Sequence, residues 1–156
     1  MKLSISDWIK KYNDGTLAPE DMPPVKFPPP IGRTLGFDLV ELGDKTATIE
    51  LKTDMAKHAN PMGTLHGGVI GDIADAAIGT AHFTTLGEGE TFTTIDLKIN
   101  FFRPVWSDTL RAKSHAVQNG RTVSYYTCDV TRADGKLVAV ATSTVMTLRG
   151  KDAIGR

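Results

Sequence analysis

The alternation of apolar and polar positions predicts strands along most of this chain. Residues 46–52 alternate cleanly, with three apolar side chains on one face of the expected strand. Asn119-Gly120 and Asp134-Gly135 are typical of tight two-residue hairpin turns, and each stands between two apolar segments. The other expected strands are residues 37–42, 91–102, 109–118, 122–132 and 137–148.

One long helix is expected over residues 66–86, where apolar residues recur with a helical period and a Gly-Glu-Gly segment follows. Asp75 falls opposite the apolar stripe, and Gly71 and Gly79 lie four residues before and after it. A glycine inside a helix costs roughly 1 kcal/mol relative to alanine, so this pair indicates close approach of a ligand or a neighbouring backbone. The alternative is that Asp72 and Asp75 only face solvent. The apolar stripe consists of Val69, Ile70, Ile73, Ala76, Ala77 and Ala81.

The first part of the chain is rich in proline and differs from the rest. Ser6 is expected to cap a short helix that carries Trp8 on its apolar side. Prolines then cluster over residues 19–30, which predicts an extended backbone and excludes a helix or a central strand there. We therefore expect residues 1–33 to form an arm, either a packing extension or a lid, on a single domain of residues 34–150.

The predicted order of elements is two strands, one long helix and four strands. This order indicates an α+β fold in which one antiparallel sheet carries the helix on one face. The helix covers only one side, yet residues 138–141 are apolar on both faces of their strand. We expect a second subunit to bury the remaining apolar surface, so the chain should be at least a homodimer.

Composition narrows the classes of partner. The 156 residues fit one domain, and 18 basic side chains balance 18 acidic ones, so the basic excess of a nucleic-acid-binding protein is missing. Cys128 is the single cysteine, which excludes an intrachain disulfide and is expected in the core. Residues 1–8 have no apolar run of signal-peptide length, and no stretch approaches a membrane span. We expect a cytoplasmic protein with neither a nucleic acid nor a membrane as partner.

The segment before the long helix, Asn60-Pro-Met-Gly-Thr-Leu-His-Gly-Gly68, has the features of a carbonyl-binding site. The start of a helix leaves backbone N–H groups unpaired and carries a partial positive charge. Gly67 and Gly68 bring no side chain there, so a carbonyl oxygen can approach these N–H groups and be polarised as negative charge develops. The carboxylate of Asp75, about two turns further along, makes the pattern more specific.

Residues 60–75 resemble the PaaI-like branch of the hotdog-fold acyl-CoA thioesterases. Thr94-Ile-Asp-Leu-Lys-Ile-Asn-Phe-Phe-Arg-Pro104 is similar to the strand that follows the helix in that family, and the resemblance runs over residues 29–148. It implies a hotdog fold, in which one antiparallel sheet wraps around a long central helix. It also implies hydrolysis of an acyl-CoA to free acid and coenzyme A, by a homodimer or a homotetramer built as a dimer of dimers.

The resemblance further implies catalytic roles at five positions of this sequence. Asp75 would act as general base on water or as nucleophile, and the N–H of Gly67 would polarise the thioester carbonyl. Thr94 would help to hold the attacking water and would meet Asp75 across a subunit boundary. Asn60 would lie near the thioester, and His66 would orient the loop.

Substrate binding needs basic partners for the phosphates of coenzyme A. Arg103 and Arg121 are the expected partners, and Gly68 completes the expected binding residues. The four histidines lack the spacing of metal ligands, so neither a metal nor a cofactor beyond the coenzyme A of the substrate is expected.

Two other functions compete with the thioesterase. One is a non-catalytic acyl-CoA or fatty-acyl binding module on the same fold, which has no need of the Asp75 carboxylate. The other is a hotdog dehydratase, which uses a histidine and a carboxylate in a different motif.

Overall fold

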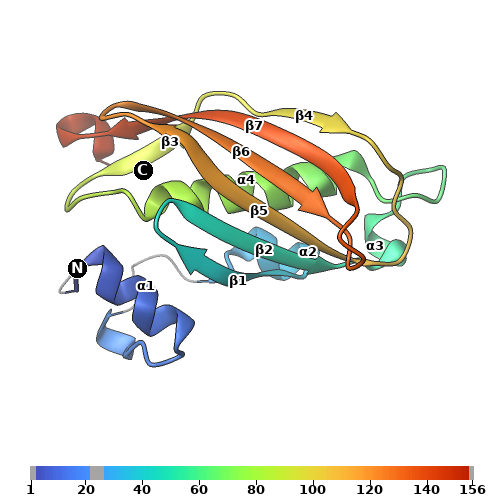
Figure 1. The fold of residues 1–156 in the computed structure, drawn as a ribbon, viewed down its shortest axis with the longest axis horizontal. Helices are drawn as coiled ribbons and strands as arrows, with labels where there is room; N and C mark the ends of the chain where they lie inside the picture. The colour runs from blue at the N-terminus through green and yellow to red at the C-terminus, as the bar shows by residue number, and fades with distance from the viewer. Residues whose placement is uncertain (1–2, 22–26, 155–156) are drawn as a thin grey trace.

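The computed structural model describes residues 3–21 and 27–154, in which a curved antiparallel sheet wraps around one long helix, α4 (Gly67–Phe83) (Figure 1). The strands follow the order β1-β2-β5-β6-β7-β3, and β4 also pairs with β7. This confirms the predicted α+β hotdog arrangement. The strands are β1 (Phe37–Gly43), β2 (Thr46–Lys52), β3 (Thr91–Thr94), β4 (Lys98–Phe101), β5 (Thr109–Asn119), β6 (Val123–Thr131) and β7 (Leu137–Leu148).

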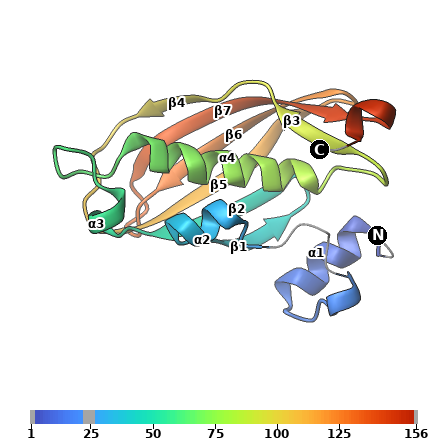
Figure 2. The ribbon, with the colours of Figure 1, turned by 180° about the vertical axis from the view of Figure 1, so that it is seen from behind.

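The concave side of the sheet forms the core together with α4, as the view from behind shows (Figure 2). Inward-facing positions of β5, β6 and β7 alternate with more exposed ones, because side chains point to opposite faces along a strand. Burial on α4 extends beyond the predicted stripe: Ala74 and Ile78 are fully buried, whereas Ala76 is only half-buried. Cys128 is buried in β6, as expected.

The predicted strand over residues 91–102 is broken into β3 and β4, so the sheet has seven strands rather than six. The break lies at Asp96, whose Oδ1 accepts the N–H of Thr144 at 3.1 Å, while its backbone oxygen accepts the hydroxyl of Ser143 at 2.7 Å. A side-chain acceptor thus takes a donor of β7 that a regular ladder would pair with backbone. The connection from β5 to β6 is also longer than the predicted two-residue turn, because β6 begins only at Val123.

The N-terminal segment contains more helix than its prolines suggested. The helix α1 (Ile5–Asn13) is capped by Ser4 rather than by the predicted Ser6, and it buries Trp8 against the domain. A 3₁₀ turn, η1 (Pro19–Asp21), and a short helix, α2 (Pro30–Leu35), lie within and after the proline cluster. The prediction of an extended backbone without a helix is wrong at Pro19–Asp21 and at Pro30, because proline suits the first turn of a helix. Its part over residues 22–26 lies outside the described residues.

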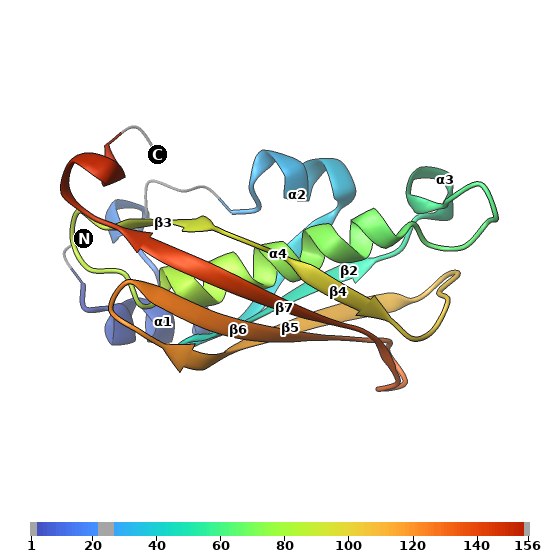
Figure 3. The same ribbon diagram turned by 90° about the horizontal axis from the view of Figure 1, so that it is seen from above.

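Two short elements complete the fold: α3 (Met55–His58), between β2 and α4, and the 3₁₀ turn η2 (Gly150–Ala153). Seen from above, α2 lies on the side of α4 opposite to β5 and β6 (Figure 3). Because α2 spans residue 33, the division of the chain into an arm and a domain at that position stays a prediction.

Candidate active site

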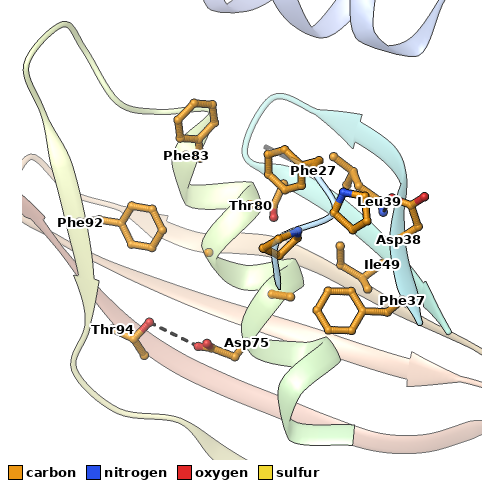
Figure 4. Close-up of a pocket in the computed structure, with 14 residues that line it drawn as sticks. Phe27, Phe37, Asp38, Leu39, Ile49, Asp75, Thr80, Phe83, Phe92 and Thr94 are labelled. Atoms are coloured by element: carbon orange, nitrogen blue, oxygen red, sulfur yellow. Dashed lines mark hydrogen bonds between the residues drawn. The ribbon is translucent and has the colours of Figure 1, made fainter. Parts of the chain in front are cut away.

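A cavity of about 290 Å³ lies beside the middle of α4 and is almost entirely apolar (Figure 4). Its walls come from α4, β1, β2, β3 and the segment just before α2. The lining residues are Phe27, Pro28, Pro29, Phe37, Asp38, Leu39, Ile49, Asp75, Ala76, Gly79, Thr80, Phe83, Phe92 and Thr94.

Asp75 and Thr94 form a polar pair in the wall of this cavity. The hydroxyl of Thr94 donates to Oδ1 of Asp75 over a long 3.4 Å. Both side chains belong to the same chain, so the expectation that they meet across a subunit boundary is wrong. The carboxylate remains accessible, yet the apolar surroundings raise the pKa of Asp75 above its ordinary value, and the negative charge of Asp72 raises it further. The Thr94 hydrogen bond opposes this rise.

The two glycines around Asp75 let the strands at the edge of the sheet come close to α4. A Cβ on Gly71 would lie 3.2 Å from Cδ1 of Ile99, and a Cβ on Gly79 would lie 3.3 Å from Cζ of Phe92. Both distances are tighter than ordinary van der Waals contact. Close approach of β3 and β4 therefore explains both glycines, and at Gly79 the missing side chain also leaves room in the cavity.

Asn60 holds the loop before α4 in shape. Its Oδ1 accepts the backbone N–H groups of Met62 and Thr64 at 2.9 and 3.2 Å, and its Nδ2 donates to Oγ1 of Thr64 at 2.8 Å. Both polar atoms of the Asn60 amide therefore make hydrogen bonds within its own loop.

His66 caps the start of α4. Its Nδ1 accepts the N–H of Gly68 at 2.8 Å, and a Cβ on Gly68 would lie only 2.8 Å from that nitrogen. Glycine at position 68 therefore permits the cap, which engages the Gly68 N–H. No acceptor in residues 3–21 and 27–154 takes the N–H of the half-buried Gly67. Gly67 thus offers the free donor at this helix start.

Gly67 opens onto a second cavity, of about 340 Å³, which shares no lining residue with the first. A Cβ on Gly67 would lie 3.1 Å from Cζ of Phe101, so the ring of Phe101 covers the start of the helix. Arg103 also lines this cavity, and its Nη1 donates to the backbone oxygen of Leu137 at 2.6 Å. The structure thus brings Arg103 near Gly67, as it brings Thr94 near Asp75.

Arg121 lies apart from both groups. It stands between β5 and β6, whose connection is at the opposite end of the sheet from the start of α4 (Figure 1). Asp75 is itself separated from Gly67 by eight residues of helix, which corresponds to roughly 12 Å.

Sequence reasoning missed the aromatic walls of the first cavity and a buried polar network behind it. Phe27 and Phe92 carry no motif, and only the fold brings them to Asp75. The ring of His82 is fully buried, with Nδ1 3.1 Å from the Tyr126 hydroxyl and Nε2 3.0 Å from the Thr147 hydroxyl. Burial lowers the pKa of His82 to about 4.

Residues 3–21 and 27–154 contain no group of three or more His, Cys, Asp or Glu side chains placed to hold a metal ion. Within the same ranges no helix has both the length and the apolar character needed to cross a membrane.

Comparison with known proteins places these features in a family. Human acyl-coenzyme A thioesterase 13 is 29% identical over 110 residues, which cover 69% of this chain and 77% of that protein. The structure of a mutant of the phenylacetic acid degradation protein PaaI from Thermus thermophilus is 28% identical. It superposes with a TM-score of 0.70 over 75% of this chain and 97% of that one.

Another structure, a thioesterase of Haemophilus influenzae, shares the fold with a TM-score of 0.74 over 90% of each chain, at 23% identity. The sequence model that describes the thioesterase superfamily matches residues 62–139, half of the chain, and this segment includes Gly67, Asp75 and Thr94. The chain therefore belongs to the thioesterase superfamily.

Proposed function

We propose that this member of the thioesterase superfamily hydrolyses an acyl-CoA thioester to the free acid and coenzyme A. The observation that carries the proposal is the Asp75 carboxylate, which has a raised pKa, a hydroxyl partner in Thr94 and an open face on an apolar cavity. The reaction needs these groups, a water molecule and the substrate, so no cofactor beyond the coenzyme A of the substrate enters the proposal. A cytoplasmic location stays a prediction.

The chemistry assigns one task to each polar group. Asp75 takes a proton from a water molecule held by Thr94, and the water oxygen attacks the thioester carbon. Negative charge then develops on the carbonyl oxygen, which the Gly67 N–H and the positive end of α4 stabilise. The carbon–sulfur bond breaks, the acid is released, and the proton that Asp75 took from water passes to the sulfur, which leaves as the thiol of coenzyme A.

We place the two halves of this machinery on different chains. Gly67 and Asp75 of one chain are roughly 12 Å apart along α4 and line separate cavities, so they cannot act on one carbonyl group. Along the edge formed by β3 and β4, Ile95, Phe101 and Phe102 are each more than half exposed. An unpaired strand edge with exposed apolar side chains favours pairing with a second copy.

The remaining predicted residues support this arrangement to different degrees. Asn60 and His66 act as positioning residues in the proposal, because their side chains fix the loop and the helix start that carry Gly67. Gly68 permits the His66 cap. Arg103, beside Gly67, is assigned to a phosphate of coenzyme A, whereas the assignment of Arg121 depends on where a partner lies. A dimer of dimers stays a prediction.

The test is turnover on a panel of acyl-CoA substrates, followed by release of free thiol. Asp75→Asn keeps the shape of the side chain and its acceptor for Thr94 but removes the base, so turnover should fall by about 10²–10⁴-fold. The matched control is Asp72→Asn, an exposed aspartate on the same helix, which should keep most of the activity. Equal activity of the two variants would exclude Asp75 as the base, and hydrolysis of no member of the panel would overturn the proposed function.

A further inference from the structure

The cavity beside Asp75 is lined on one side by a piece of the chain that lies outside the sheet and α4. Phe27, Pro28 and Pro29, the residues just before α2, contribute part of its wall. The ring of Phe27 lies near Thr80 on α4 and Leu39 on β1 (Figure 4). This wall exists because the chain packs its own N-terminal segment over the open side of α4.

Several contacts fix this segment to the domain. Nη1 of Arg33 donates to the backbone oxygen of Pro28 at 2.8 Å. Gly32 lies so close to the fully buried ring of Phe37 that an added Cβ would be 3.0 Å from both Phe37 Cε2 and Pro28 Cβ. The prolines also restrict the backbone on either side of these contacts. The wall is therefore a packed part of the molecule.

Within this wall, Phe27 stands at the far end of the cavity from the reacting group. Figure 4 shows Asp75 and Thr94 together at one end of the cavity, with Phe27 and Phe83 well removed from them. Along α4, Phe83 follows Asp75 by eight residues, or roughly 12 Å. A thioester carbonyl at Asp75 would thus direct its acyl group along α4 toward Phe27.

The size and chemistry of the cavity limit what that acyl group can be. An apolar cavity of about 150 Å³ holds a benzene ring, so the 290 Å³ found here has room for about twice that number of carbon atoms. The ionisable side chains that line it are Asp38 and Asp75, both acidic. A second carboxylate on the acyl group would meet like charge and an apolar wall, and both are unfavourable.

We propose that Phe27 sets the largest acyl group this site accepts, and that the site selects uncharged, apolar acyl groups of about ten to twelve carbons. The inference rests on the proposed function, because it takes the thioester to lie at Asp75. The N-terminal segment thereby acts in substrate selection as the end wall of the acyl site.

The test separates binding from catalysis. Thioether analogues of acyl-CoA with alkyl chains of increasing length cannot be hydrolysed, so their dissociation constants report the cavity alone. For the unmodified protein, affinity should rise about fourfold with each added methylene and stop rising near ten to twelve carbons. A thioether of equal length that ends in a carboxylate should bind at least about tenfold more weakly.

Two substitutions at Phe27 should move the chain length at which affinity stops rising, and they should move it in opposite directions. Phe27→Ala should shift it to longer chains by about two to six carbons, since a six-carbon ring is removed, and Phe27→Trp should shift it to shorter ones. The control is Ile31→Ala, in the same segment but half exposed and outside the cavity wall, which should leave the limit unchanged.

The outcomes distinguish the two proposals. An unchanged length limit in both Phe27 variants overturns the role of the wall, even if the enzyme hydrolyses acyl-CoA. Equal binding of the charged and uncharged thioethers overturns the selection for apolar groups. Absence of acyl-CoA hydrolysis together with the expected shifts overturns the proposed function, but supports the wall.

Discussion

At the scale of single residues, the side chain proposed for catalysis is held in surroundings that oppose its charge. Asp75 lies among apolar groups and near Asp72, and both effects raise its pKa. The folded chain therefore holds the Asp75 proton more tightly than the unfolded chain does. As pH rises through the raised pKa, ionisation of Asp75 favours unfolding.

The first prediction at this scale follows from the raised pKa of Asp75. Asp75→Asn removes the disfavoured charge, so it should raise the midpoint of thermal unfolding at pH 7 while it lowers turnover. The gain should shrink at acidic pH, where the wild-type carboxyl group is protonated and no longer opposes folding. Thermal denaturation of both proteins across this range measures the effect. If Asp75→Asn is less stable than wild type at pH 7, the apolar surroundings and the Asp72 charge do not oppose ionisation of Asp75.

His82 gives a second prediction, with a defined pH window. Burial holds the pKa of the folded-state imidazole at about 4, compared with the ordinary value of 6.5, so the network with Tyr126 and Thr147 contains the neutral ring. Its contribution to stability is complete above pH 6.5 and is lost as pH falls toward 4, because the unfolded chain then binds a proton that the folded chain excludes.

Protonation of His82 alone should therefore lower the free energy of unfolding by roughly 1.4 kcal/mol for each unit by which pH falls between 6.5 and about 4. Urea titrations at several pH values measure the slope. The variant His82→Gln should lose this part of the pH dependence, whereas His115→Gln, at an exposed position on β5, should keep it. Equal slopes in both variants would show that another group governs acid sensitivity.

At the scale of elements, the start of α4 is arranged to leave one donor free. The cap from His66 engages Gly68, Asn60 holds the preceding loop, and the N–H of Gly67 remains without a partner among the described residues. Because Gly67 is the first residue of the helix, proline is compatible with this position. The backbone of His66 is extended, as a residue before proline requires.

This geometry permits a substitution that removes a single hydrogen-bond donor. Gly67→Pro should retain the helix and reduce turnover by about 10²–10³-fold, the usual effect of losing an oxyanion donor. Gly67→Ala is the matched control, because it places a Cβ against Phe101, as proline does, but keeps the N–H. If the two variants lose activity equally, crowding rather than the N–H explains the loss.

The sequence predicted most elements because their patterns are local. The strand β2 and the helix α4 follow from alternation and helical period, and an antiparallel sheet with one helix on its face follows from their order. The hotdog fold itself was expected from the resemblance to the thioesterases. The break between β3 and β4 was missed, although Asp96 inside an apolar run was a signal, since aspartate is depleted in strands. The pairing of Asp75 with Thr94 in one chain depends on tertiary packing, and so does the placement of Phe27.

At the scale of the whole molecule, the apolar edge of the sheet and the proposed division of the site between chains both predict a second copy. Light scattering should give at least a dimeric mass at micromolar concentration, and a monomer would leave each half of the proposed site incomplete.

Mixing two inactive variants tests the shared site directly. A two-fold dimer of Gly67→Pro and Asp75→Asn chains contains one site with both lesions and one with neither. Co-expression in equal amounts should therefore restore about a quarter of wild-type turnover, since half of the dimers are mixed and each has one intact site. If both residues acted within one chain, the mixture would stay as inactive as its components.

The number of helical residues between Gly67 and Asp75 sets the distance between these two groups along α4. If the two ends of this interval serve different sites, its length matters more than the identity of the residues within it. One inserted residue would turn everything beyond it by about 100° and advance it by about 1.5 Å. Asp75 would then take the place of the half-buried Ala76, and Ala74 would take the place of Asp75. Substitutions between Gly67 and Asp75 are therefore expected to be tolerated where packing permits. An insertion or deletion there would move the Asp75 carboxylate away from its cavity.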